Sequence, residues 1–213
     1  MDIAAIKQIV PDVTARQIEQ LTAYCDMITD WNQRINLVSR KDIEFFEENH
    51  LLPSIVALEM VDIPQNSSLA DIGSGGGLPA IPIAILRQDI EVTMLESILK
   101  KSVFLQNVVE ELELGNARVV RSRVEDLGGD YKKSFDMVTA RAVASVGQLI
   151  KWGKPLLRSG GQWTLWKGES DREDLFNSVR KIGYPIEIFD VPEHLHSLSG
   201  KFEFMRIFQI DMI

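Results

Sequence analysis

The stretch that decides the fold of this chain is Leu69-Ala70-Asp71-Ile72-Gly73-Ser74-Gly75-Gly76-Gly77-Leu78-Pro79. It reads as a short apolar strand, a glycine-rich turn and the start of a helix, where a proline suits the first position. Glycine lets the backbone adopt a positive φ and approach a ligand closely. In an open parallel sheet the ligand crevice lies beyond the carboxyl ends of the strands, at such a turn. The stretch therefore predicts a ligand-binding turn in a doubly wound α/β protein.

Two acidic residues help to choose the ligand. Asp71 stands two positions before Gly73, where its carboxylate would face the ligand, repel a pyrophosphate and attract the ammonium of a methionyl group. Glu96 ends the next strand, at the spacing where a carboxylate accepts ribose hydroxyls in either class of cofactor. The segment Gly75–Ala80 also satisfies the GxGxxA form of a dinucleotide fingerprint. Asp71 therefore favours S-adenosyl-L-methionine over a nicotinamide dinucleotide.

Downstream of the turn, strand-like runs alternate with helical stretches, a pattern typical of right-handed crossovers and a mostly parallel sheet with helices on both faces. Only a loop separates the last two strands, so we expect a hairpin and one antiparallel strand. The pattern thus predicts a Rossmann-like, seven-stranded sheet. Strands are expected at Leu69–Ile72, Val92–Glu96, Ala117–Ser122, Phe135–Ala140, Gly161–Lys167, Pro185–Asp190 and Glu203–Ile210, and helices at Pro79–Leu86, Ile98–Leu114, Gly147–Leu157 and Asp171–Ile182.

Upstream of the turn the chain is expected to be helical. Apolar residues recur every three or four positions from about Val13 to Phe46, the stripe of an amphipathic helix, and Asp12 is its expected N-cap. A second helical stretch, Asp42–Met60, is interrupted near Pro53. We therefore expect an N-terminal helical region, residues 1–62, followed by a methyltransferase domain, residues 63–213.

Composition and charge narrow the class of protein. Cys25 is the only cysteine, which excludes an internal disulfide and a cysteine-based zinc cluster. No secretory signal or membrane-spanning run is readable, so we expect a cytosolic protein. The net charge is −8, yet residues 100–167 hold 12 basic and 7 acidic groups while both flanking segments are acidic. This asymmetry indicates a local anionic partner, with chance clustering as the alternative.

Beyond these patterns, the chain resembles a known family, the RsmG (GidB) 16S ribosomal RNA methyltransferases, which methylate a guanine N7 in the decoding region of the small subunit. The paired prolines Pro79 and Pro82 and the element Arg141-Ala142-Val143-Ala144-Ser145 are specific to that family. The match runs through nearly the whole chain and also includes Trp31-Asn32, Ile35-Asn36-Leu37, the turn from Asp71 to Pro82, and Ser122-Arg123-Val124-Glu125.

The resemblance implies roles for particular residues. Gly73 and Leu78 are expected to line the cofactor site, with Val124 and Glu125 beside the adenine and Arg141 at the mouth near the methyl donor. We add Asp71, Gly75 and Glu96 from the motif. The chain departs from the family at Gly76, where proline is common, at Glu96, where aspartate also occurs, and at Asn49, where arginine usually precedes the histidine. The last departure makes His50 a helix-packing residue in our interpretation.

Guanine N7 has a free lone pair, so its methylation requires no general base, and we expect catalysis by alignment. The major groove of A-form RNA is too deep and narrow for side chains, so the target base must be unpaired or flipped. Arg141 is expected to position the substrate, by holding a phosphate or by stacking on the displaced base, with a purely structural role at the strand end as the alternative. The RNA-facing surface is expected to comprise Lys100, Lys101, Arg123, Arg141, Lys151, Lys154 and Lys167.

No metal site is expected. His194 and His196 are two positions apart without an evident third ligand nearby, so we place them in a surface loop. The expected partner is 16S rRNA or the small ribosomal subunit, and a monomer is the default. Two other functions stay open: methylation of a non-RNA substrate, and a non-catalytic, cofactor-binding role in ribosome assembly.

Overall fold

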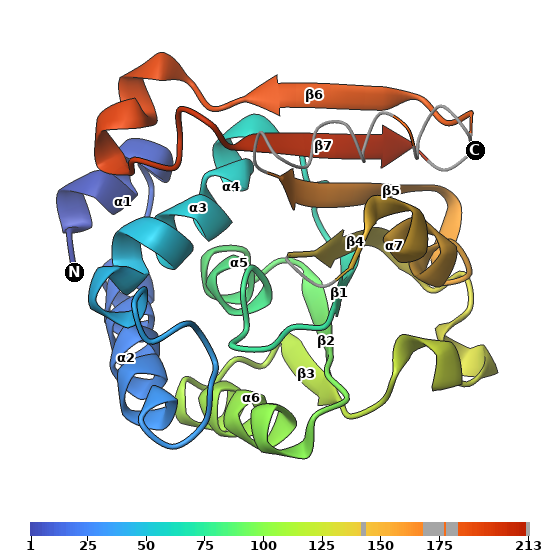
Figure 1. Cartoon of the computed structure of the whole chain (residues 1–213), viewed down its shortest axis with the longest axis horizontal. Coiled ribbons are helices and arrows are strands. Elements are labelled where there is room, and N and C mark those ends of the chain that lie inside the picture. Colours follow the sequence, from blue (N-terminus) through green and yellow to red (C-terminus); the bar gives the residue numbers. More distant parts are fainter. Residues whose placement is uncertain (142–143, 168–176, 178–182, 212–213) are drawn as a thin grey trace.

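The computed structural model describes residues 1–141, 144–167, 177 and 183–211. Its centre is a seven-stranded sheet in the order β3-β2-β1-β4-β5-β7-β6 (Figure 1). The first five strands are mutually parallel, and β7 runs antiparallel to both of its neighbours. The strands are β1 (Ser68–Ile72), β2 (Glu91–Leu95), β3 (Ala117–Val120), β4 (Phe135–Ala140), β5 (Leu157–Lys167), β6 (Ile186–Asp190) and β7 (Arg206–Asp211).

The predicted fold class is confirmed, and each predicted strand overlaps an observed one. The expected hairpin is also present, since β6 and β7 pair directly. Its second strand inserts between β5 and β6, so the antiparallel strand lies inside the sheet. The first strand is central and its last four residues are buried, as expected where both faces of a parallel sheet are covered.

The two faces of the sheet have different covers. Because side chains alternate along a strand, Leu69 and Ala70 of β1 belong to different apolar clusters. On the face of Leu69 lie the N-terminal helices together with α5 (Ala80–Leu86) and α6 (Leu99–Glu111). On the other face lies α7 (Val146–Gly153). Residues on both sides of the expected division near residue 62 thus share one apolar cluster.

The N-terminal helices differ from the prediction in their ends. A short helix, α1 (Ile3–Ile9), precedes α2 (Ala15–Asn32), and Thr14 rather than Asp12 caps α2 through a capping box with Gln17. The predicted continuation of α2 to Phe46 is wrong. The Asn32 side chain accepts hydrogen bonds from the backbone N–H groups of two later residues, Leu37 and Val38, and so bends the chain back after the helix.

The second predicted helical stretch is broken into short pieces. A 3-10 turn, η1 (Ile43–Phe45), leads into a π-helical turn, η2 (Glu47–Leu51), followed by α3 (Leu52–Ile55) and α4 (Ala57–Met60). Pro53 lies in the first turn of α3, which explains the break that the sequence predicts there. The predicted helix Asp171–Ile182 falls, apart from Asn177, outside the described residues.

The sheet order places the functional crevice. The strand order runs outward in opposite directions from β1 and β4, so the topological switch point lies between these two strands. The glycine-rich segment follows β1 at this point (Figure 1). None of the helices in the described ranges is long and apolar enough to span a membrane.

Close packing of α7 on the sheet gives a test of the fold. A Cβ added to Gly153 would lie 1.9 Å from Cζ2 of the buried Trp163, so Gly153→Ala must displace a rigid ring. We expect the substitution to lower the free energy of unfolding by about 1–3 kcal/mol. The control is Gly129→Ala, where an added Cβ meets no atom within 4 Å. Urea unfolding should show a change within about 0.5 kcal/mol for the control, and equal effects of the two substitutions would contradict the packing.

Candidate functional site

The glycine-rich turn has the geometry that its sequence predicts. Gly73, Gly75 and Gly77 have φ values of 69°, 57° and 90°. At Gly77 an added Cβ would also lie 2.5 Å from Cγ1 of Ile81, so the turn requires glycine there for steric as well as conformational reasons. The N–H of Gly73 donates to the carbonyl oxygen of Leu95 at 2.8 Å, which ties the start of the turn to the end of β2.

Two side chains from outside the turn hold it in place. The hydroxyl of Tyr24, a fully buried residue of α2, donates to the carbonyl oxygen of Gly76 at 2.7 Å. From the other side, the Glu96 carboxylate accepts from the N–H of Gly75 at 2.9 Å and from the N–H of Ile98 at 2.7 Å. The turn therefore links the N-terminal helix to the carboxyl end of β2.

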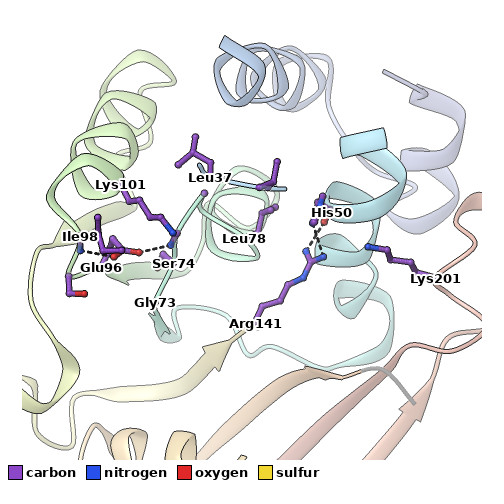
Figure 2. A pocket seen from close by; sticks show the side chains of 14 residues that line it. Leu37, His50, Gly73, Ser74, Leu78, Glu96, Ile98, Lys101, Arg141 and Lys201 are labelled. Atoms are coloured by element: carbon purple, nitrogen blue, oxygen red, sulfur yellow. Dashed lines mark hydrogen bonds between the residues drawn. The ribbon is translucent and has the colours of Figure 1, made fainter. Parts of the chain in front are cut away.

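A cavity of about 580 Å³ opens above the turn (Figure 2). A smaller recess of about 190 Å³ shares Gly73 and Ser97 with it and extends towards the segment after β3. The cavity is lined by Leu37, Val38, His50, Gly73, Ser74, Gly75, Gly76, Leu78, Glu96, Ser97, Ile98, Lys101, Arg141 and Lys201. Its walls thus come from the N-terminal region, the sheet and the C-terminal segment alike.

Asp71 lies beneath the turn and does not line the cavity, contrary to the expectation that it faces the ligand directly. The side chain is buried, and its Oδ1 accepts a hydrogen bond from Oγ1 of Thr139 at 2.8 Å. Burial raises the pKa of Asp71 to about 7. Its Oδ2 atom is buried and has no hydrogen-bond partner among the described residues. A cation above the turn would favour the ionised carboxylate.

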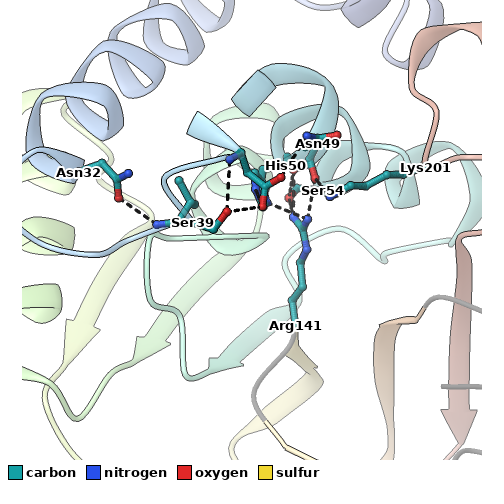
Figure 3. A network of polar contacts seen from close by, with 9 residues as sticks. Asn32, Ser39, Asn49, His50, Ser54, Arg141 and Lys201 are labelled. Carbon is teal, nitrogen blue, oxygen red and sulfur yellow. Dashed lines mark hydrogen bonds and ion pairs between the residues drawn. The ribbon is translucent and has the colours of Figure 1, made fainter. Parts of the chain in front are cut away.

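Arg141 closes the opposite wall of the cavity. Its guanidinium follows the end of β4 and donates to the carbonyl oxygens of Asn49 and His50 at 3.0 Å each, and to Oγ of Ser54 at 2.9 Å (Figure 3). A further contact of 3.1 Å joins it to Nδ1 of His50. The side chain therefore ties the sheet to the helical turns after residue 47.

His50 is fixed in one protonation state by this contact. A guanidinium can only donate, so Nδ1 of His50 is the acceptor and the ring proton lies on Nε2. Burial, reinforced by the charges of Arg141 and Lys201, lowers the pKa of His50 to about 4. The Nε2 atom points towards Asp42, 3.8 Å from its Oδ2. His50 is thus a neutral part of the cavity wall as well as a packing residue.

Comparison with known proteins identifies the family. Residues 17–185 match the family described as GidB, rRNA small subunit methyltransferase G.

The chain belongs to the rRNA small subunit methyltransferase G family.

Similar proteins of this name occur in several bacteria. One from Desulfitobacterium hafniense is 36% identical over 173 residues, covering 80% of this chain and 71% of the relative. One from Roseiflexus castenholzii is 42% identical over 158 residues, covering 73% and 67%. One from Corynebacterium diphtheriae is 36% identical over 195 residues, covering 89% and 86%. The prediction of an S-adenosylmethionine-dependent rRNA methyltransferase is confirmed at the level of the family.

Solved structures agree on the fold at much lower identity. A SAM-dependent methyltransferase from Aquifex aeolicus superposes with a TM-score of 0.62 at 10% identity, covering 79% of this chain and 93% of that one. A tRNA (m1A58) methyltransferase from the same organism gives 0.59 at 13% identity, covering 84% and 72%. The sheet of this member of the methyltransferase G family therefore has the fold of the class I methyltransferases.

The structure brings most of the predicted cofactor residues together. Gly73, Gly75, Leu78, Glu96 and Arg141 line the cavity, and Val124 and Glu125 line the adjoining recess. The sequence did not single out Leu37, Val38 or Lys201 as site residues. Leu37 and Val38 follow the bend set by Asn32, and Lys201 comes from a C-terminal loop with no motif, so their positions depend on long-range packing.

The predicted RNA-facing residues separate into several groups. Lys101 lines the cavity, Arg123 lines the recess, and Lys100 is exposed beside them at the start of α6. Lys151 borders a third cavity, and the exposed Lys154 has its Nζ 5.5 Å above the ring of Tyr184. Lys167 was placed wrongly on this surface, because it is only 8% exposed at the end of β5.

The two histidines near the C-terminus lie in a 3-10 helix, Glu193–Leu198, rather than in an open loop. The Nε2 atom of His194 is 3.6 Å from the carboxylate of Glu59, and that of His196 is 2.9 Å from the carbonyl oxygen of Val191. Each histidine ring thus has its own protein contact, and the two rings contact different groups.

The buried carboxyl of Asp71 predicts how stability depends on pH. Because its folded-state pKa is raised from 3.8 to about 7, the folded protein holds a proton that the unfolded chain releases in this range. The free energy of unfolding without cofactor should fall as the pH rises between these values, by at most about 1.4 kcal/mol per pH unit from this group.

Because asparagine does not titrate, we expect Asp71→Asn to remove this part of the pH dependence. The asparagine oxygen can still accept the hydrogen bond from Thr139. Urea titrations at several pH values measure it. Asp12→Asn, at an exposed position, serves as the control and should retain the wild-type slope. A slope unchanged by Asp71→Asn would show that Asp71 titrates normally.

Proposed function

We propose that the protein transfers a methyl group from S-adenosyl-L-methionine to N7 of a guanine in 16S rRNA, guanine 527 by the family resemblance. One observation supports this most directly: the cavity joins a glycine turn with a buried carboxylate, Glu96, to a cationic wall formed by Arg141 and Lys201. The first half suits a nucleoside with an amino acid side chain, and the second suits an RNA substrate.

The residues of the site fit the methyl donor. Gly73, Gly75 and Leu78 would hold it against the turn, and Glu96 retains lone pairs for ribose hydroxyls beyond the two that its backbone contacts use. Val124 and Glu125 would border the adenine. Asp71 would act from below through its charge, with an Oδ2 atom that is buried and unpartnered within the described ranges. When bound, the donor supplies an activated methyl group on a sulfonium.

The side chains around the cavity provide alignment rather than proton transfer. The lone pair of guanine N7 lies in the ring plane, so no proton has to leave before attack. The Nδ1 atom of His50 is occupied by Arg141, and both oxygens of Glu96 accept backbone N–H groups. These residues therefore maintain the shape of the cavity and exclude water, which favours a near-attack geometry.

The substrate guanine must leave its stack to reach this cavity, because side chains cannot read N7 in a regular A-form helix. Basic residues in the cavity, at the recess and on the neighbouring surface would contact the RNA backbone. We assign this role to Lys100, Lys101, Arg123, Lys151 and Lys154, while Arg141 would position the substrate through the cavity wall that it holds in place. The acceptor would be the small subunit or its 16S rRNA. The protein would act on it in the cytosol as a monomer.

Glu96 gives a quantitative test of the cofactor site. Glu96→Gln removes the charge and leaves a single oxygen for two backbone N–H groups, so the turn loses part of its support. We expect the Kd for S-adenosylmethionine and for S-adenosylhomocysteine to rise about 10–100-fold in calorimetry. Glu91→Gln, on an exposed residue at the opposite end of the same strand, is the matched control and should change neither Kd.

The reaction itself is tested by incubating the purified protein with methyl-labelled S-adenosylmethionine and either 16S rRNA or small subunits lacking the modification. We expect label in RNA, and chemical cleavage at 7-methylguanine should map it to one position. Label in a protein or small molecule would identify a different acceptor. Cofactor binding without any transfer would instead identify a non-catalytic assembly factor.

A further inference from the structure

The two ends of the cavity differ in charge. Glu96 lies at the end beside the glycine turn, and Arg141 and Lys201 lie together at the other end (Figure 2). Glu96 is the only acid among the described residues that line the cavity. Lys101 of α6 lies beside Glu96 at the same end and offsets its charge (Figure 2). The end formed by Arg141 and Lys201 therefore lacks a lining carboxylate that could balance it.

Arg141 and Lys201 share one hydrogen-bond acceptor. The carbonyl oxygen of Asn49 accepts from the Arg141 guanidinium at 3.0 Å and from Nζ of Lys201 at 3.2 Å. Since both nitrogens contact one atom, the two positive charges lie close together (Figure 3). Like charges at such separation repel, and a neutral carbonyl compensates only part of this cost. The arrangement favours an anion beside the pair.

The groups around the pair leave it positively charged. His50 is neutral, because burial lowers its pKa to about 4. Asp42, which accepts from Oγ of Ser39 at 2.7 Å and from Nδ2 of Asn49 at 3.3 Å, lies near Lys201 and offsets part of its charge, so the pair keeps a net positive charge. Asp71 lies beneath the turn, outside the cavity. Its carboxyl accepts a hydrogen bond from Oγ1 of Thr139.

The two cations have different freedom. Arg141 makes its contacts to Asn49, His50 and Ser54, so its guanidinium is committed to holding the wall. Lys201 is exposed, and within the described ranges its bond to Asn49 uses one of three N–H groups. Figure 3 shows its side chain reaching from the C-terminal segment towards Arg141. Lys201 is thus the group placed to meet an incoming anion.

We infer that Lys201, positioned next to Arg141, binds a backbone phosphate of the RNA beside the target guanine. This rests on the proposed function, because it assigns the substrate contact of the same cavity. A phosphate oxygen would accept from the Lys201 ammonium and neutralise the paired charges, which orients the flipped nucleotide towards the turn. Lys201 is a positioning residue and takes no part in bond making.

Three variants of the full chain test the inference. Lys201→Gln removes the charge, Lys201→Arg retains it, and Lys7→Gln removes a charge from an exposed residue of α1 as a matched control. Each is measured for binding of S-adenosylhomocysteine, for binding of 16S rRNA at several salt concentrations, and for kcat and KM of methyl transfer.

For Lys201→Gln we expect the KM for RNA to rise about tenfold. The slope of log affinity against log salt concentration is negative, and its magnitude should fall by about 0.7, the value for one phosphate contact to a single strand. The Kd for S-adenosylhomocysteine should match the wild type. Lys201→Arg should recover most of the RNA affinity, and Lys7→Gln should leave both RNA measurements unchanged.

Several outcomes would overturn the inference. A Lys201→Gln variant with the RNA affinity and salt slope of Lys7→Gln would show that no phosphate meets this residue. A weaker affinity for S-adenosylhomocysteine would instead assign the anion to the carboxylate of the cofactor. Both results are binding measurements, so a wild type that binds RNA but methylates none would refute the proposed function separately.

Discussion

The structure depends on one backbone bend, from Gly73 to Gly77, in which Gly73, Gly75 and Gly77 take positive φ values that favour glycine. The bend is fixed by two hydrogen bonds from distant parts of the chain: Tyr24 holds the carbonyl of Gly76, and Glu96 holds the N–H of Gly75. Because Tyr24 belongs to α2 and Glu96 follows β2, the turn, the first long helix and the second strand form one unit. The cavity above the turn takes its shape from this unit.

The N-terminal region is therefore part of the site and not an appendage to the sheet. Leu37, Val38 and His50 line the cavity, and Arg141 binds the backbone at Asn49 and His50. A class I sheet alone would supply the cofactor half of the cavity. The opposite side of the cavity is lined by His50, from the helical turns before β1, and by Lys201, from the C-terminal segment.

The sequence predicted the elements whose signals are local. Strand periodicity, the glycine turn and the position of Glu96 all follow from neighbouring residues, so they could be read without the fold. The end of α2 could not, because it depends on the Asn32 side chain bonding residues five and six positions later. The burial of Asp71 beside Thr139 and the position of Lys201 beside Asn49 depend on contacts between residues far apart in the sequence. Lys167 shows the same limit, since only packing reveals that it is buried.

The charges that line the cavity bear on the direction in which positive charge moves during methyl transfer. Methyl transfer from a donor held by the glycine turn would move positive charge from its sulfonium to the imidazole ring of guanine. That ring would approach the wall that contains Arg141 and Lys201, where a second cation is unfavourable. An RNA phosphate at Lys201 would offset this repulsion as the methyl group moves. A free guanine base carries no such phosphate, so the charge pattern itself favours a guanine embedded in RNA over the isolated base.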